Sequence, residues 1–148
     1  MVQFRPMTAA DAPAVMDMMR VFFASPAVLT DGSDEIFRRD IEICVSDDPA
    51  AQGWVFDDGG TLAGYSMLTR GYSTEYGRIV WWIDDLYVVP EHRGEGIGSA
   101  FIQFVKERFP GAMLKLEVEE DNTRALAVYR KNGFEMLGYR VMIARQRV

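Results

Sequence analysis

The chain has 148 residues, 49% of them hydrophobic and 26% charged, and its formal net charge is −6. This balance predicts one globular domain over residues 1–148 with a sizeable core. No apolar run approaches the roughly 18 residues of a membrane helix, and the first residues show no apolar signal core, so we expect a cytoplasmic protein without a membrane partner. An acidic chain without a Lys/Arg run disfavours nucleic acid and suits cationic partners. The single cysteine and histidine, Cys44 and His92, exclude a disulfide framework and supply no metal site.

Apolar residues at helical spacing predict two helices early in the chain. A short strand over Val2–Arg5 precedes the first helix, which should run from about Ala9 to Ala24. Thr8 and Asp11 have the spacing of a capping box, with Asp in place of the usual Glu. Ser33, followed by two acidic residues, has the pattern of a second helix start.

The middle of the chain changes to the pattern of β-strands. Residues 54–56 and 62–68 flank a turn at 57–60 that contains two glycines, which predicts an antiparallel hairpin. Arg78–Val89 follows as a long strand of bulky residues, and Pro90 terminates it.

The last part of the chain predicts a crossover between parallel strands. A helix and a strand should follow residue 90, so the unit strand–helix–strand over 78–119 forms a right-handed crossover. Together with the antiparallel hairpin before it, this crossover predicts a mixed sheet with helices on both faces. The expected elements are a helix from Ile97 to near Phe109, a strand over Met113–Glu119, a short helix between Asn122 and Gly133, and a closing strand pair over Phe134–Ala144 that turns at Gly138.

The segment Val88–Ser99 is the most informative part of the chain, because a strand ends there and three alternate glycines open a helix. Helix starts expose unpaired N–H groups, and glycines let the backbone approach an anion closely, so this turn suits a phosphate or pyrophosphate. A Walker loop is excluded, since no Gly-Lys-Ser/Thr occurs in the chain. A dinucleotide fingerprint fits Gly94 and Gly96 but has Ser99 in its third place, and it sits late in the chain.

Two motifs at matching separation resemble the GNAT N-acetyltransferase superfamily, particularly its members that act on small amines or polyamines. Residues 88–98 have the form V-x-P-x-x-R-G-x-G-I-G, which is similar to the acetyl-CoA signature of that family. Residues 116–134 resemble its L-x-V-x-x-x-N-x-x-A-x-x-x-Y-x-x-x-G-F block. The resemblance implies an α+β, three-layer mixed α/β fold, with six to seven strands in a central mixed sheet and about four helices.

The resemblance also implies acetyl-CoA as co-substrate, bound where two parallel strands separate. The pantetheine arm would pair with exposed strand backbone, and the pyrophosphate would lie on the glycine turn. Asn122 matches the family's cofactor-contacting Asn, although a helix N-cap is an equally good role for it. The implied cofactor-binding residues are Leu86, Tyr87, Val88, Arg93, Gly94, Glu95, Gly96, Ile97, Gly98, Ser99, Asn122 and Ala125.

Two residues are candidates for the proton transfers of acetyl transfer. By its position in the family motif, Tyr129 would protonate the departing thiolate, although it also lies on an apolar helical stripe and suits a core position. The resemblance also implies Asp84, nine residues before Arg93, as the candidate base for the ammonium of the acceptor. Asp84 and Asp85 are consecutive on a strand, so we expect them to point to opposite faces, with Asp85 in a structural contact. Glu119 and Glu120 are secondary candidates.

The sequence therefore predicts an acetyl-CoA-dependent N-acetyltransferase that transfers directly to a primary amine in a ternary complex. The acidic balance, with Asp31, Asp34 and Glu35 near the expected acceptor side, favours a small cationic amine such as a polyamine or an aminoglycoside. A protein amine remains open as acceptor. A homodimer is expected because many family members dimerise. Two other classes stay open: a non-catalytic acyl-CoA-binding sensor and a dinucleotide-dependent oxidoreductase.

Overall fold

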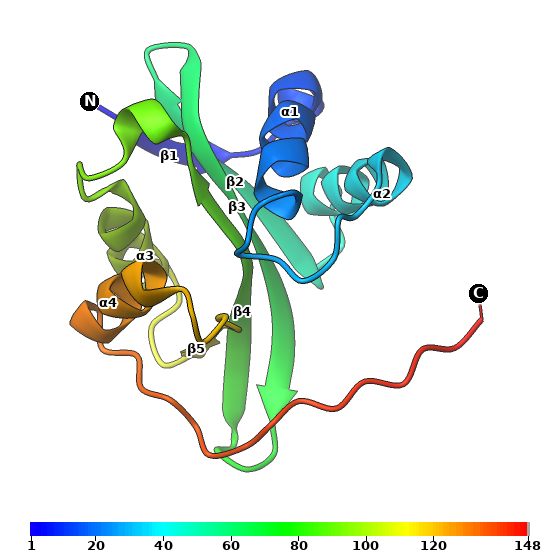
Figure 1. The fold of residues 1–148 in the computed structure, drawn as a ribbon, viewed down its shortest axis with the longest axis vertical. Helices are drawn as coiled ribbons and strands as arrows, with labels where there is room; N and C mark the ends of the chain where they lie inside the picture. The colour runs from blue at the N-terminus through cyan, green and yellow to red at the C-terminus, as the bar shows by residue number, and fades with distance from the viewer. Residues whose placement is uncertain (148) are drawn as a thin grey trace.

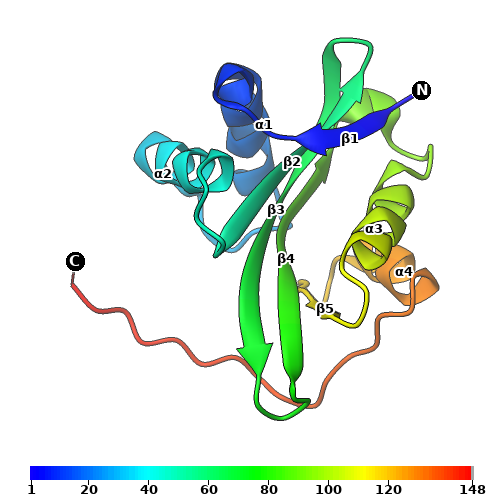
Figure 2. The same ribbon diagram turned by 180° about the vertical axis from the view of Figure 1, so that it is seen from behind.

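The computed structural model describes residues 1–147, which form one five-stranded sheet covered by helices on both faces. The strand order is β1-β2-β3-β4-β5; all neighbours are antiparallel except the parallel pair β4 and β5. Helices α1 and α2 lie on one face and α3 and α4 on the other (Figures 1 and 2). The elements are β1 Gln3–Pro6, α1 Ala12–Phe23, α2 Asp34–Val45, β2 Ala51–Asp58, β3 Thr61–Ser73, β4 Arg78–Val88, α3 Ile97–Arg108, β5 Met113–Lys115 and α4 Thr123–Lys131.

The sheet separates two apolar cores, because alternate side chains of its long strands point to opposite faces. Beneath α1 and α2, the core includes Val15, Met19 and Tyr65, all fully buried. Beneath α3, it includes Phe56 and Phe101, whose rings lie 4.8 Å apart. The α+β three-layer architecture is confirmed.

The predicted helix starts are confirmed by their hydrogen bonds. The backbone N–H of Thr8 donates to Asp11 Oδ2 at 2.8 Å, as in a capping box, and Arg5 holds the same carboxylate through both of its oxygens at 2.9 Å. The first turn, Ala9–Asp11, is a 3-10 helix, so the α-helix begins three residues later than expected. The hydroxyl of Ser33 accepts from Ile36 N–H at 3.2 Å and caps α2.

The parallel strands β4 and β5 separate after a short contact. Their pairing covers Val80–Trp82 against Met113–Lys115, while β4 continues to Val88. The expected strand Met113–Glu119 therefore ends at Lys115. From Ile83 onward, the edge of β4 that faced β5 has no strand partner within residues 1–147, which leaves a wedge between β4 and the segment after β5.

The sheet has five strands rather than six to seven, because the expected closing pair over Phe134–Ala144 does not form. Gly138 is outside the left-handed region, and the chain bends there without reversing, so no hairpin closes. Residues 134–147 instead run past the tip of the β3–β4 hairpin (Figure 1). Tyr139 donates its hydroxyl hydrogen to Glu75 Oε2 of that hairpin at 2.6 Å.

Candidate functional site

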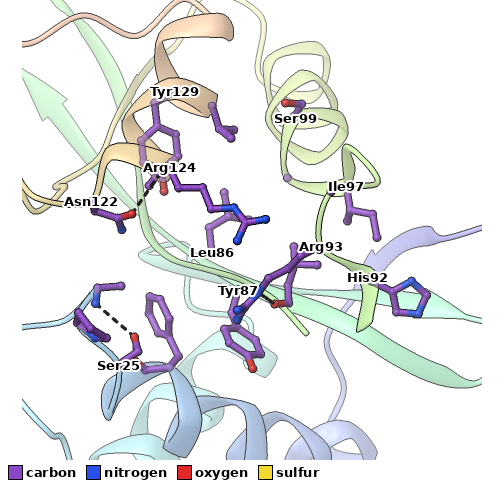
Figure 3. A pocket seen from close by; sticks show the side chains of 18 of the residues that line it. Ser25, Leu86, Tyr87, His92, Arg93, Ile97, Ser99, Asn122, Arg124 and Tyr129 are labelled. Carbon is purple, nitrogen blue, oxygen red and sulfur yellow. Dashed lines mark hydrogen bonds between the residues drawn. The ribbon is translucent and has the colours of Figure 1, made fainter. Parts of the chain in front are cut away.

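A cavity of about 890 Å³ opens where β4 and β5 separate, a volume within the range of small-molecule sites. Four parts of the chain wall it: the end of α1 with the loop after it, the end of β4, the glycine turn with the start of α3, and the segment from Glu119 into α4 (Figure 3). Because the wall comes from both sides of the wedge, the cavity exists only while the two strands stay apart.

The glycine turn presents bare backbone to this cavity. Gly94 and Gly96 have φ of +81° and +80°, a left-handed conformation that side chains disfavour. A Cβ built on either glycine, or on Gly98, would meet no heavy atom within 4 Å, so no side chain of residues 1–147 fills the turn. Gly96 caps α3 without a side-chain hydrogen bond, and the first helical bond runs from Ala100 N–H to Gly96. The N–H groups before Ala100 at this helix start are free to bind an anion.

Positive side chains line the same cavity. The Nε of Arg93 donates to the carbonyl oxygen of Val88 at 3.0 Å, and its guanidinium lies 5.6 Å from the centre of the Tyr87 ring. These contacts fix Arg93 beside the end of β4 while leaving its terminal nitrogens free. Arg124 extends into the cavity from α4 (Figure 3). Lys131, farther along the same helix, also lines the cavity. The three cations and the bare amides together suit a ligand with several phosphate groups.

Asn122 is the N-cap of α4, which is one of the two roles predicted for it from the sequence. Its Oδ1 accepts from Ala125 N–H at 3.2 Å, and both residues line the cavity. The side-chain amide nitrogen of Asn122 remains available on the cavity side (Figure 3).

Tyr129 points from α4 into the cavity rather than lying wholly in the core (Figure 3). It also packs against the apolar core beneath α3, with its ring 5.8 Å from that of Phe134. Its hydroxyl makes no hydrogen bond to any other group in residues 1–147. Burial raises the pKa of this phenol, so it stays protonated and can donate a hydrogen bond.

A β-bulge overturns the expectation that Asp84 and Asp85 point to opposite faces. On β3, Met67 pairs with Asp85 and Leu68 pairs with Ile83, so Asp84 is an extra residue in β4 without a partner. The extra residue breaks the alternation of the strand. Asp85 accepts a hydrogen bond from Tyr65 and Asp84 accepts one from Thr69, and these two residues of β3 lie on the same face of the strand, the face of the core beneath α1 and α2. Both carboxylates therefore lie on that side of the sheet.

The two carboxylates at the bulge have different environments. Asp85 is buried and accepts the Tyr65 hydroxyl at 2.7 Å, which confirms the structural contact expected for it. Burial, with the nearby charges of Asp40 and Asp84, raises its pKa to about 7. Asp84 accepts from Thr69 Oγ1 at 2.6 Å, and partial burial raises its pKa as well. Burial also raises the pKa of Asp40 on α2, so three carboxylates with raised pKa values occupy this region.

The structure brings together nearly all of the residues singled out from the sequence. Tyr129 and the implied cofactor-binding residues line the cavity, with the exception of Glu95, which lies outside it and hydrogen-bonds His92 Nδ1 at 2.8 Å. Asp84 also lies outside the cavity wall. Ser99 lines the cavity, but its hydroxyl accepts from Asn132 Nδ2 at 2.9 Å, so it is engaged with the α4 end.

Sequence reasoning missed part of the wall. Arg124, Val128 and Lys131 recur at helical spacing of four and three residues, and this pattern predicts one shared face, next to the face that carries Ala125 and Tyr129. The wall from α1 and its following loop had no comparable local signal, because only the tertiary fold brings it over β4. The residues missed are Val21, Ser25, Pro26, Ala27, His92, Asp121, Arg124, Val128 and Lys131.

Comparison with known proteins decides the family. Residues 14–134 match the model of the acetyltransferase (GNAT) family, which is most of the chain. The chain belongs to the GNAT family. Its fold superimposes on a possible acetyltransferase from Clostridium difficile 630 with a TM-score of 0.83 and 17% identity, covering 99% of this chain and 98% of that one.

Two curated relatives are named as acetyltransferases of thialysine and of peptidyl-lysine. Over 82 residues the chain is 38% identical to a thialysine N-epsilon-acetyltransferase of Bos taurus, covering 53% of this chain and 48% of that protein. Over 104 residues it is 33% identical to the peptidyl-lysine N-acetyltransferase YjaB of Salmonella typhimurium. This match covers 69% of this chain and 63% of that protein. The matches thus span about half to two-thirds of the length of these relatives.

Membrane-spanning helices and metal-binding clusters are both absent from residues 1–147. None of the helices there has the length and apolar content needed to cross a membrane. Within the same range, no three His, Cys, Asp or Glu side chains are grouped closely enough to hold a metal ion.

Proposed function

We propose that this GNAT protein is an acetyl-CoA-dependent N-acetyltransferase that transfers the acetyl group directly to a primary amine, with a small cationic amine as the favoured acceptor. The observation that carries the proposal is the run of bare amides from Gly94 to Ser99, which faces a cavity formed by two diverging strands. The residues fit the CoA moiety: the helix start with Arg93, Arg124 and Lys131 matches its phosphates, and the unpaired β4 edge matches its amide-containing arm.

Within this proposal, two residues move protons around the transfer. The amine nitrogen attacks the thioester carbonyl, a C–N bond forms, and the C–S bond breaks to release the CoA thiolate. Tyr129, held in the cavity with its hydroxyl unpaired and protonated, donates a proton to that thiolate. The attacking nitrogen loses one proton as it becomes an amide, and this proton restores the Tyr129 phenol. Asp84 accepts the proton of the incoming ammonium through a water relay, since it lies outside the cavity wall. Its raised pKa makes it a better base than an ordinary aspartate.

The carboxylates at the bulge support a cationic acceptor. Asp40, Asp84 and Asp85 come from α2 and β4 on one side of the sheet, and they favour an ammonium group over a neutral or anionic acceptor. The relatives named above act on thialysine and on peptidyl-lysine, which are also primary amines on flexible chains. A lysine side chain of a protein is therefore the second candidate acceptor.

The test combines a binding and a turnover measurement on the same preparation. Thermal unfolding is followed with acetyl-CoA and, separately, with NAD(H); we expect stabilisation by acetyl-CoA. Stabilisation by NAD(H) alone would favour a dinucleotide-dependent oxidoreductase. Release of free thiol is then assayed with a panel of polyamines, aminoglycosides, amino acids and lysine peptides. Tight acetyl-CoA binding without turnover of any acceptor would favour the sensor.

A further inference from the structure

His92 lies between two turns that are far apart in the sequence. It ends the 3-10 helix Pro90–His92, directly before the glycine turn, and this helix lies beside the turn between β2 and β3 (Figures 1 and 2). The Nδ1 of His92 is 2.8 Å from Glu95 Oε1 in the glycine turn, and its Nε2 is 3.4 Å from Asp58 Oδ2 at the end of β2. The imidazole ring therefore bridges the glycine turn and the β2–β3 hairpin.

This bridge requires a protonated ring. A neutral imidazole has one N–H and can donate to only one of the two carboxylates, whereas the imidazolium donates to both. The hydrogen bond to Glu95, together with the charges of Asp58 and Glu91, raises the pKa of His92 above its ordinary value of 6.5. The bridge is therefore complete at pH values up to at least 6.5 and is lost as the pH rises further.

Two positive groups near this bridge are directed elsewhere. The Nε of Arg93 donates to the carbonyl oxygen of Val88 at 3.0 Å. The α-amino group of Met1 is 3.8 Å from Asp58 Oδ1, which is not the oxygen that faces His92. Neither group replaces the imidazolium as the link between the two carboxylates.

Glu95 places a negative charge in the turn that would hold the diphosphate of the cofactor. It stands between Gly94 and Gly96, and none of the backbone N–H groups of residues 94–96 donates to another backbone group within residues 1–147. Such amides at a helix start attract carboxylates as well as phosphates, so a released Glu95 side chain would compete with the diphosphate or repel it. In the structure Glu95 is bonded to His92 and lies outside the cavity.

We propose, on the basis of the function proposed above, that protonated His92 is a positioning residue for acetyl-CoA, because it joins Asp58 to Glu95 and keeps the Glu95 carboxylate away from the diphosphate. His92 itself lines the cavity, so the negative charge of the bound cofactor in turn stabilises the imidazolium. The two effects are the same coupling seen from either side. Acetyl-CoA therefore binds more tightly to the protein that carries the proton on His92.

The first test follows the proton directly. Because His92 is the only histidine of the chain, its ring C–H resonances report its protonation in an NMR titration. We expect Glu95→Gln to lower the midpoint, and we expect acetyl-CoA to raise the midpoint of the unsubstituted protein. Glu107→Gln is the matched control on the exposed side of α3, and its midpoint should be unchanged. An unchanged midpoint in Glu95→Gln overturns the proposal, whether or not acetyl-CoA binds.

The second test measures acetyl-CoA affinity by isothermal titration calorimetry at about pH 6.5 and about pH 8.5. A phosphate monoester of the cofactor titrates near pH 6 with every variant, so the variants are compared with one another. We expect the unsubstituted protein and Glu107→Gln to lose about fivefold more affinity over this range than His92→Gln or Glu95→Gln.

The outcomes separate this role from the proposed function. Equal pH dependence in the unsubstituted protein and in His92→Gln overturns the positioning role and leaves the transferase proposal intact. Absence of acetyl-CoA binding at both pH values, with the His92–Glu95 contact confirmed by NMR, overturns the proposed function and this role with it.

Discussion

Tyr65 and Asp85 form a buried hydrogen bond across β3 and β4, with the phenol donating to Asp85 Oδ2 at 2.7 Å. Asp85 is 7% exposed, and burial raises its pKa from 3.8 to about 7 even though the Tyr65 hydrogen bond opposes the rise. The charged carboxylate therefore destabilises the fold near neutral pH. Buried carboxylates with raised pKa values are concentrated at functional sites, so this part of the sheet is a functional candidate.

We expect Asp85→Asn to make the protein more stable above pH 7. At pH values below 3.8, the ordinary pKa of the group, Asp85 is protonated in both the folded and the unfolded state. It then has no electrostatic effect on the free energy of unfolding. Between that value and about 7, the folded state keeps a proton that the unfolded state releases, so stability falls as pH rises. The amide removes this penalty and still accepts from Tyr65, so we expect a gain on the order of 1–3 kcal/mol at about pH 8.

Urea unfolding at about pH 4 and about pH 8 measures this effect. Asp47→Asn, in the exposed loop after α2, is the control. Its free energy of unfolding should equal that of the unsubstituted protein at both pH values. Parallel pH profiles for Asp85→Asn and the unsubstituted protein would show that the buried charge is not the cause.

The sequence was informative where local patterns determine structure. The glycine turn, the Ser33 and Asn122 caps and the order of helices and strands follow from short-range spacing, and the structure has them. The bulge at Asp84 depends on the register between two strands, and no residue near it marks an insertion. The pair expected over Phe134–Ala144 failed for a related reason: its residues favour a strand, but strand propensity does not specify the partner.

We expect Gly64→Ala to destabilise the sheet strongly. A Cβ at this position would collide with the carbonyl oxygen of Tyr87 and lie 2.7 Å from Phe56 Cδ2, so β3 and β4 would have to move apart. Overpacking of this kind should cost about 3 kcal/mol in the free energy of unfolding. Gly71→Ala is the matched control on the same strand, where the nearest heavy atom, Trp82 Nε1, is 4.0 Å away. Denaturant unfolding compares the two, and equal losses would contradict the packing argument.

We expect Arg124→Ala to weaken acetyl-CoA binding about tenfold, since it removes a charge that faces the proposed phosphate site. The weakened binding should also depend less on salt, because one fewer cation contributes. Arg130→Ala removes an arginine of the same helix that does not line the cavity, and its affinity should be unchanged. Isothermal titration calorimetry at two salt concentrations distinguishes the variants. An equal loss in both would mean that α4 contributes through its stability or through the overall field of the protein.

We expect Tyr129→Phe to lower kcat by about a hundredfold or more and to leave the KM for acetyl-CoA nearly unchanged. The ring, its packing against Phe134 and the cavity wall all persist, while the proton that stabilises the leaving thiolate is lost. Tyr72→Phe is the control, because Tyr72 is exposed on β3 and lies outside the cavity. Initial rates of thiol release across a range of pH measure the effect. A rise in KM at constant kcat would instead make Tyr129 a binding residue, and unchanged kinetics would leave the thiolate to take its proton from water.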